Sequence, residues 1–356
     1  MRKKVLVLSS THSTFIRQDE QLLKQYFEIH TFHLEPALSR LHALRNQVKM
    51  ALWLARNINN CDALFVTFAD VHAFIMALFS RTFGKKLFVV VGGFDATWIP
   101  EIGYGTYHKK RSRFFTRFTF RTAAHILPVC ASLKKFGEEV RGPYHVTQGV
   151  LTLYPEIPEN KITVVPNGYK TKFFVPSSSP KNSATVLLVA SARTPVSYIV
   201  KGIDLFIQLA RECPHWSFVL AGTRPSSETT LPSNFKALPF LRHEDLLKEF
   251  QRAKVLLSLS ATEGMANVLS EGMLCECVPV GFPVGGTPEV IADTGILLEN
   301  RDMETIIAGI EKAFTMDGHK ARQRVLDHFP MEKRGQTLAQ IIDRIITEPS
   351  GHHGTR

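Results

Sequence analysis

The chain has 356 residues, of which 44% are hydrophobic and 21% are charged, a composition typical of a globular protein long enough for two domains. No run of eighteen apolar residues is present, which argues against a spanning helix, and the apolar run after the first four residues is too short for a secretory signal peptide. Five cysteines without metal-ligand spacing are typical of a reducing compartment, so we expect a cytoplasmic protein.

The net charge of +11 is concentrated in the first half of the chain. Residues 1–175 contain 24 Lys and Arg against 12 Asp and Glu, whereas the remainder contains 19 against 20. This asymmetry predicts that the first half meets an acidic partner, such as a lipid surface, a nucleic acid or a phosphorylated acceptor. The chain has no recognised nucleic-acid-binding module, so we do not expect a nucleic-acid partner.

Short apolar runs alternate along the chain with longer amphipathic segments. The amphipathic segments 201–212 and 243–253 are typical of helices. Continuous apolar runs between helices indicate parallel sheets covered on both faces. The expected strands fall into two sets, first 4–10, 63–68, 87–93 and 126–130, then 185–191, 217–222, 255–260 and 278–282.

A segment rich in Ser and Pro separates the two sets of strands and predicts a linker. The sequence therefore predicts two doubly wound α/β domains that face each other, with a final helix placed to cross back to the first domain. The predicted divisions are a first domain at 1–174, the linker at 175–185, a second domain at 186–330, the last helix at 331–348 and a disordered tail at 349–356. Ligands of such sheets bind beyond the carboxyl ends of the strands, so we expect a site between the domains.

Two glutamates follow the expected strand at 255–260. Glu263 lies on the turn, and Glu271 lies in a helix that starts near Asn267. The amides of a strand-to-helix turn can bind a phosphate, and the two carboxylates can accept hydrogen bonds from the hydroxyl groups of a ribose or sugar. A sugar nucleotide has both features. The alternative is that Glu263 is an ordinary helix-start charge and that Glu271 lies on a solvated helix face.

The run 263-EGMANVLSEGMLCECVPVGFPVGGTPEVI-291 closely resembles the family 4 glycosyltransferases, which belong to group 1 and have the GT-B fold. The matching pattern is two glutamates separated by seven residues, a cysteine at the end of the helix, a Pro-Val strand and a GG-x-PE turn. The runs at 124–135 and 161–174 also resemble parts of that family. The resemblance covers most of residues 120–330, and it implies two Rossmann-like domains facing across a cleft.

The resemblance also implies a role for each matching residue. Glu263 would face the donor sugar, Glu271 would hold the ribose, and Arg193 and Lys201 would bind the diphosphate as its negative charge grows. Gly264, Met265, Ala266 and Asn267 would present backbone to the sugar and diphosphate, while Phe240, Leu241 and Arg242 would contact the nucleobase of UDP or GDP. No metal or cofactor is expected, because fixed cations can stabilise the leaving group.

The first half departs from the family pattern. A histidine is usual where this chain has Gly92, although Gly93 and Asp95 remain and are the candidate residues on the acceptor side. The loop after the first strand, at 9–20, lacks the usual glycines, and Lys170 replaces an acidic residue. These departures predict that the chain differs from its relatives in its acceptor site.

A segment at 107–125 combines six Lys and Arg with four Phe. Cations and aromatic residues on one helix suggest an interfacial helix on anionic lipid. The alternative is an ordinary helix whose Phe side chains pack in the core. Membrane attachment at the cytoplasmic face would suit a lipid-linked acceptor.

The sequence therefore predicts a metal-independent glycosyltransferase. It would move a sugar from a nucleotide-diphosphate donor to a glycan or glycolipid, with retention, in the synthesis of surface polysaccharides or glycoconjugates. Two alternatives are a sugar-nucleotide epimerase or hydrolase of the same fold, and a degenerate protein that binds nucleotide sugars without transferring them.

Overall fold

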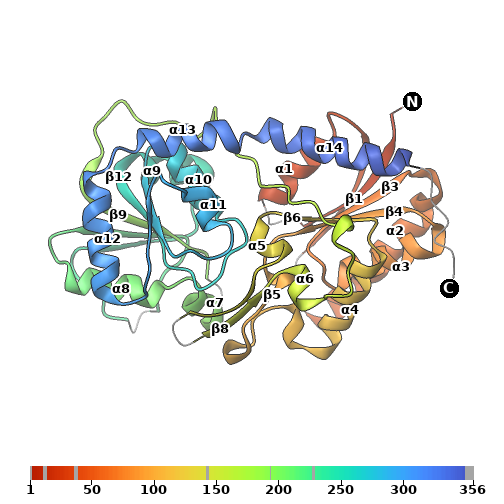
Figure 1. The fold of residues 1–356 in the computed structure, drawn as a ribbon, viewed down its shortest axis with the longest axis horizontal. Coiled ribbons are helices and arrows are strands. Elements are labelled where there is room, and N and C mark those ends of the chain that lie inside the picture. The colour runs from red at the N-terminus through yellow and green to blue at the C-terminus, as the bar shows by residue number, and fades with distance from the viewer. Residues whose placement is uncertain are drawn as a thin grey trace.

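The computed structural model describes residues 2–10, 14–35, 39–141, 144–192, 194–226 and 229–348. The chain folds into two α/β halves that lie side by side, and each half is built on a parallel sheet (Figure 1). The tail predicted at 349–356 lies outside the described residues.

The sheet of the first half has five parallel strands in the order β2-β1-β3-β4-β6. Its central strands are buried on both faces, as their continuous apolar sequences predict. The strands are β1 (Lys4–Ser10), β2 (Glu28–Leu34), β3 (Ala63–Thr67), β4 (Lys86–Val91) and β6 (His125–Pro128).

The sheet of the second half has six parallel strands in the order β11-β10-β9-β12-β13-β14. The strand β9 begins within the segment predicted as a linker at 175–185, so the linker ends earlier than its Ser and Pro content suggests. The strands are β9 (Asn182–Val189), β10 (Ser217–Ala221), β11 (Phe235–Leu238), β12 (Ala253–Ser258), β13 (Val278–Gly281) and β14 (Ile296–Leu297).

Helices cover both faces of each sheet. In the first half they are α1 (Thr14–Leu23), α2 (Arg40–Asn57), α3 (Val71–Phe83), α4 (Lys110–Thr122), α5 (Ala131–Lys134) and α6 (Val150–Leu153). In the second half they are α7 (Pro195–Val200), α8 (Ile203–Glu212), α9 (His243–Arg252), α10 (Asn267–Leu274), α11 (Thr287–Ile291), α12 (Met303–Thr315) and α13 (His319–His328), and α14 (Met331–Thr347) ends the described chain. Short 3₁₀ turns complete the connections as η1 (Ile58–Asn60), η2 (Phe94–Ala96), η3 (Pro100–Ile102), η4 (Thr106–His108) and η5 (Glu159–Lys161).

Several strands are absent from the sequence prediction. A small antiparallel sheet joins β5 (Thr97–Trp98), β8 (Tyr144–Gln148) and β7 (Gly137–Arg141) in that order. The edge strands β2 and β11 carry polar and partly exposed residues, so they lack the continuous apolar run that marks the central strands. Their place in the fold is set by pairing with β1 and β10.

The last helix, α14, returns from the second half and lies along the first (Figure 1). Its Arg334 forms a two-pronged ion pair with Asp19 of α1, with both N–O distances 2.6 Å, and both side chains are buried. The same guanidinium donates to the carbonyl oxygens of Val165 and Pro166 at 2.7 and 2.9 Å. One side chain therefore joins α14, α1 and the segment that leads from the first half to the second.

We expect Arg334→Met to lower the free energy of unfolding by about 3–5 kcal/mol, because it leaves the buried Asp19 carboxylate and two carbonyl oxygens without their partner. Urea denaturation followed by circular dichroism measures the change. The matched control is Lys3→Met, which removes a more exposed ion pair to Asp343 of the same helix and should cost less than about 1 kcal/mol. Equal losses in the two variants would contradict a special role for Arg334.

Candidate functional site

A cavity of about 430 Å³ opens at the carboxyl ends of the strands in the second half. Its walls come from the ends of β9 and β10, the loop before α9, and the turn that leads from β12 into α10. The position is the one expected for a ligand of a doubly wound sheet. Eight of the sequence-predicted residues line it, namely Lys201, Phe240, Leu241, Glu263, Met265, Ala266, Asn267 and Glu271.

Lys201 and Glu263 form an ion pair inside the cavity, with Lys201 Nζ 2.5 Å from Glu263 Oε1. Lys201 caps the carboxyl end of α7, and Glu263 lies on the turn after β12. The hydroxyl of Ser260 donates to the same carboxylate oxygen at 2.6 Å. The ammonium group is therefore held at the sheet edge by a carboxylate that an incoming anion can replace.

Helix α10 directs two polar side chains at the cavity. It begins at Asn267, as the sequence predicts, and Glu271 follows four residues later on the same face. Glu271 is buried, and burial raises the pKa of its carboxyl group to about 8, with Lys170 acting in the opposite direction. The cation that replaces an acidic residue at position 170 thus faces the carboxyl group expected to hold a ribose.

Asn267 is held from the segment that joins the two halves. Its Oδ1 atom accepts a hydrogen bond from Asn167 Nδ2 at 2.8 Å and another from the hydroxyl of Tyr169 at 3.1 Å. Met265 also contacts this segment, since its sulfur accepts from the backbone N–H of Asn167. Sequence reasoning assigned no role to Asn167 or Tyr169, although both lie in the run at 161–174 that resembles the family.

The first half touches the turn at Gly264 through backbone atoms. A side chain at Gly264 would place its Cβ 2.0 Å from the carbonyl oxygen of Gly92, so only glycine fits there. A Cβ at Gly92 would lie 2.3 Å from the ring of Phe68, which occupies the space that a histidine side chain would need. The ring of Phe68 therefore explains why this chain has Gly92 where the family usually has a histidine.

Asp95 does not face the cavity and supports the fold instead. Its carboxylate accepts hydrogen bonds from the backbone N–H groups of Gly92, Gly93 and Ala69 at 3.0–3.2 Å. Burial raises its pKa to about 6 against these stabilising bonds. The Asp95 side chain is 1% exposed and fixes the glycine turn, and its assignment to the acceptor side stays a prediction.

Gln148 and Tyr104 approach Glu263 from the first half, and Glu289 contacts the first half from the second. Gln148 of β8 donates through Nε2 to the carbonyl oxygen of Glu263 at 3.0 Å. Tyr104 has a raised pKa because it is buried and faces the charges of Glu263 and Asp95. Glu289 of the GG-x-PE turn accepts from the backbone N–H of Ala131 in the first half at 2.7 Å. No motif marks Gln148 or Tyr104, so their roles appear only in three dimensions.

The remaining predicted donor-site residues are Gly264, which packs against Gly92, together with Arg193 and Arg242. Arg193 lies outside the described residues. Arg242 is exposed at the start of α9 and does not line the cavity, whereas its neighbours Phe240 and Leu241 do.

The sequence comparisons point to one family. Residues 170–325 match the family described as glycosyl transferases group 1. A phosphatidylinositol N-acetylglucosaminyltransferase subunit of Homo sapiens is 27% identical over 175 residues, which cover 45% of this chain and 34% of that protein. The corresponding Arabidopsis thaliana protein is 25% identical over 168 residues, covering 44% and 37%. The matched region thus spans about a third of the length of these curated relatives.

The whole fold resembles solved glycosyltransferase structures. Sucrose-phosphate synthase from Thermosynechococcus elongatus has a TM-score of 0.75 at 13% identity, covering 97% of this chain and 99% of the other. Anabaena HepE in complex with UDP and glucose has a TM-score of 0.69 at 14% identity, covering 96% and 100%. These likenesses confirm the predicted two-domain GT-B fold. Residues 170–325 are therefore similar in sequence to the group 1 glycosyltransferases, and the whole chain shares the fold of solved glycosyltransferase structures.

Proposed function

We propose that the chain transfers a sugar from a UDP-sugar to a lipid-linked acceptor at a membrane surface. The observation that carries the proposal is the cavity that gathers Lys201, Glu263, Asn267 and Glu271 at the carboxyl ends of one parallel sheet. A cation for a diphosphate and a carboxyl group for a ribose lie in the same space. The family match supports the reaction class.

In this proposal the donor displaces the Lys201–Glu263 ion pair. Lys201 turns from the carboxylate to the diphosphate, which carries more charge, and Glu263 is released toward the sugar. The amide groups at the start of α10 supply further positive potential to the phosphates. We propose that these fixed groups stabilise the leaving diphosphate without a resident metal ion.

The transfer itself exchanges one bond at the anomeric carbon. The bond from this carbon to the diphosphate oxygen breaks with its electron pair, and a bond to the acceptor oxygen forms. The proton of the acceptor hydroxyl passes to the leaving diphosphate, so no separate protein base is required at Gly92. We propose that both events occur on one face of the sugar, which retains its configuration.

The nucleobase is proposed to lie on the loop before α9. Phe240 is 72% exposed and lines the cavity beside Leu241, so its ring offers a stacking surface for a base. Uracil is favoured because the similar structure of Anabaena HepE contains UDP. The names of the human and Arabidopsis relatives favour N-acetylglucosamine as the sugar and an inositol phospholipid as the type of acceptor.

The helices of the first half support a membrane-bound acceptor. Helix α2 exposes Leu41, Leu44, Val48 and Leu52 along one face, with Leu41 78% exposed. The sequences of α2, α3 and α4 contain no Asp or Glu and ten Lys or Arg. This combination is typical of a surface that lies on anionic lipid. Within the described residues, no helix has the length and apolar character needed to cross a bilayer.

The segment at 107–125 contributes less apolar surface than its sequence suggests. Phe120 of α4 is buried, and Phe115 and Phe118 pack on Phe74 of α3. Phe114 is the phenylalanine of α4 that remains exposed in the described structure. We therefore propose that α2 provides the apolar contact with lipid and that α4 provides mainly charge.

We expect calorimetric titration to show that UDP binds more tightly than GDP, ADP, dTDP or CMP. Glu271→Ala should weaken UDP binding at least tenfold, since it removes the proposed ribose contact. Arg252→Ala, an exposed change in the same domain, is the control and should leave binding unchanged. Failure of every nucleotide to bind at millimolar concentration would contradict the donor site.

We expect UDP affinity to rise with pH between 7 and 9. The Glu271 carboxyl has its pKa raised to about 8 by burial, so it is largely protonated at pH 7, and only its ionised form can accept from both ribose hydroxyls. Binding should therefore be roughly tenfold weaker at pH 7 than at pH 9. Calorimetry across this range should give a flat profile for Glu271→Gln, and the same slope in that variant would assign the titration to another group.

We expect donor consumption to depend on an acceptor. UDP release from UDP-N-acetylglucosamine should be slow in buffer and should accelerate with vesicles that contain phosphatidylinositol. Lys201→Met should lower kcat by about 100-fold, because it removes a charge that faces the leaving group. Rapid release of free sugar without vesicles would instead indicate a hydrolase.

A further inference from the structure

A second cavity, of about 600 Å³, lies in the first half, at the ends of its strands that are farther from the donor cleft. It is bordered by the amino ends of β4 and β6, at Lys86 and at 122–124. Gly92 and Gly93, which touch the donor turn, follow the other end of β4. A six-residue strand spans about 20 Å, so the two cavities are separate sites.

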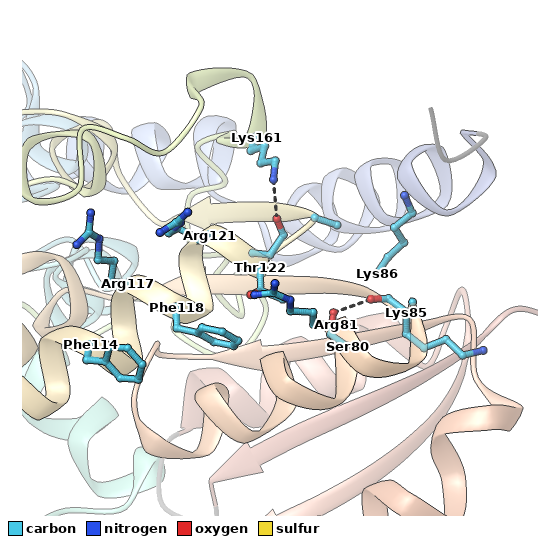
Figure 2. Close-up of a pocket in the computed structure, with 13 residues that line it drawn as sticks. Ser80, Arg81, Lys85, Lys86, Phe114, Arg117, Phe118, Arg121, Thr122 and Lys161 are labelled. Atoms are coloured by element: carbon cyan, nitrogen blue, oxygen red, sulfur yellow. Dashed lines mark hydrogen bonds between the residues drawn. The ribbon is translucent and has the colours of Figure 1, made fainter. Parts of the chain in front are cut away.

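The lining of this second cavity is strongly basic. It contains six cationic side chains and no acidic one, and the cations are Arg81, Lys85, Lys86, Arg117, Arg121 and Lys161. They come from α3, the turn after it, the start of β4, α4 and the turn at η5 (Figure 2). Phe114 and Phe118 form an apolar part of the wall.

Two of the six cations bind partners that do not line the cavity. Arg117 pairs with the carboxylate of Glu156 at 2.5 Å. Lys85 extends away from the others and donates to the carbonyl oxygen of Cys61 at 2.6 Å (Figure 2). Within the described residues, the other four form no ion pair with a carboxylate, and these four are Arg81, Lys86, Arg121 and Lys161.

Two of these four cations, Arg81 and Lys161, are held in place at the cavity wall. Arg81 lies over the ring of Phe118 at 5.9 Å, which fixes its guanidinium at the wall. Lys161 is half-buried and donates to the carbonyl oxygen of Ala123 at 3.5 Å. The pKa of Lys161 is lowered by burial and by the nearby charge of Lys86. Mutual repulsion of this kind is relieved when an anion binds.

The ends of the nearby helices do not balance this charge. Helices α3 and α4 both end beside the cavity, and the carboxyl end of a helix carries about half a negative charge. Together the two helix ends supply about one negative charge, whereas the four cations carry four positive charges. An anion with two negative charges, such as a phosphate monoester, would offset most of the positive charge that remains.

We propose that this cavity is a second anion site, which binds a phosphate monoester through Arg81, Lys86, Arg121 and Lys161. The volume suits a small phosphorylated molecule rather than a bare ion. The phosphate can belong to a lipid headgroup or to a soluble metabolite, since both present the same group. The site is separate from the donor cleft, so the proposal does not depend on the transfer reaction.

The test uses the full chain and two probes that share one phosphate group. Glycerol 3-phosphate represents the soluble source, and phosphatidylcholine vesicles with phosphatidic acid represent the lipid source. Calorimetry measures the first and co-sedimentation at fixed ionic strength measures the second. Arg121→Gln and Lys161→Gln should each weaken binding of at least one probe about tenfold, because each removes a charged donor.

The matched control is Arg111→Gln, which removes a cation from the same helix outside the cavity, where its guanidinium lies 5.3 Å from the ring of Phe115. It should change binding less than twofold in both assays. Lys201→Met, in the donor cleft, should also have no effect on either probe. Thermal unfolding confirms that each variant is folded, and Arg121→Lys should retain binding.

Each outcome has a distinct meaning. If Arg121→Gln and Lys161→Gln weaken the binding of glycerol 3-phosphate, the site is assigned to soluble phosphates. If they weaken only the binding of the vesicles, the site is assigned to a lipid headgroup. Equal losses in Arg111→Gln and Arg121→Gln would show general surface charge and overturn the proposal. Loss in Lys201→Met, or binding of neither probe, would also overturn it.

Discussion

The arrangement of the site depends on a backbone contact between two glycine turns. Gly264 meets the carbonyl oxygen of Gly92 so closely that position 264 cannot accept a larger residue without a backbone shift, and Phe68 imposes the same limit on position 92. This contact joins the first half of the chain to the turn that carries Glu263, and Asp95 fixes the other side of it through three backbone N–H groups. The carboxylate of Glu263 and the amino end of α10 thereby face one cavity, and the side chains of Gln148 and Glu289 add hydrogen bonds between the two halves.

The sequence predicted the second half better than the first. Lys201, Glu263 and Glu271 come from one compact α/β unit, where strand ends and helix starts determine which side chains share an edge. Asp95 could not be placed in this way, because its buried position depends on two separate loops whose backbone N–H groups meet at its carboxylate. Gln148 reaches the site from a small antiparallel sheet, and no apolar pattern in the sequence predicts that sheet. Contacts of high sequence separation are therefore the part that pattern reasoning missed.

The charge asymmetry of the sequence has a structural explanation in the helices of the first half. Acidic residues are absent from α2, α3 and α4, and three of the cations of these helices line the basic cavity beside Lys161. The donor cavity in the second half contains Lys201 already paired with Glu263. The chain thus separates a basic surface suited to anionic lipid from a nearly neutral cleft suited to a nucleotide, which explains why net charge alone could not identify the function.

The most direct test of the central claim is a crystal structure of the chain with UDP bound. The account predicts that the ribose hydroxyls lie within hydrogen-bond distance of the Glu271 carboxylate, and that Lys201 leaves Glu263 to contact the diphosphate. UDP bound elsewhere, or bound with the Lys201–Glu263 ion pair intact and Glu271 free of contacts, would contradict it.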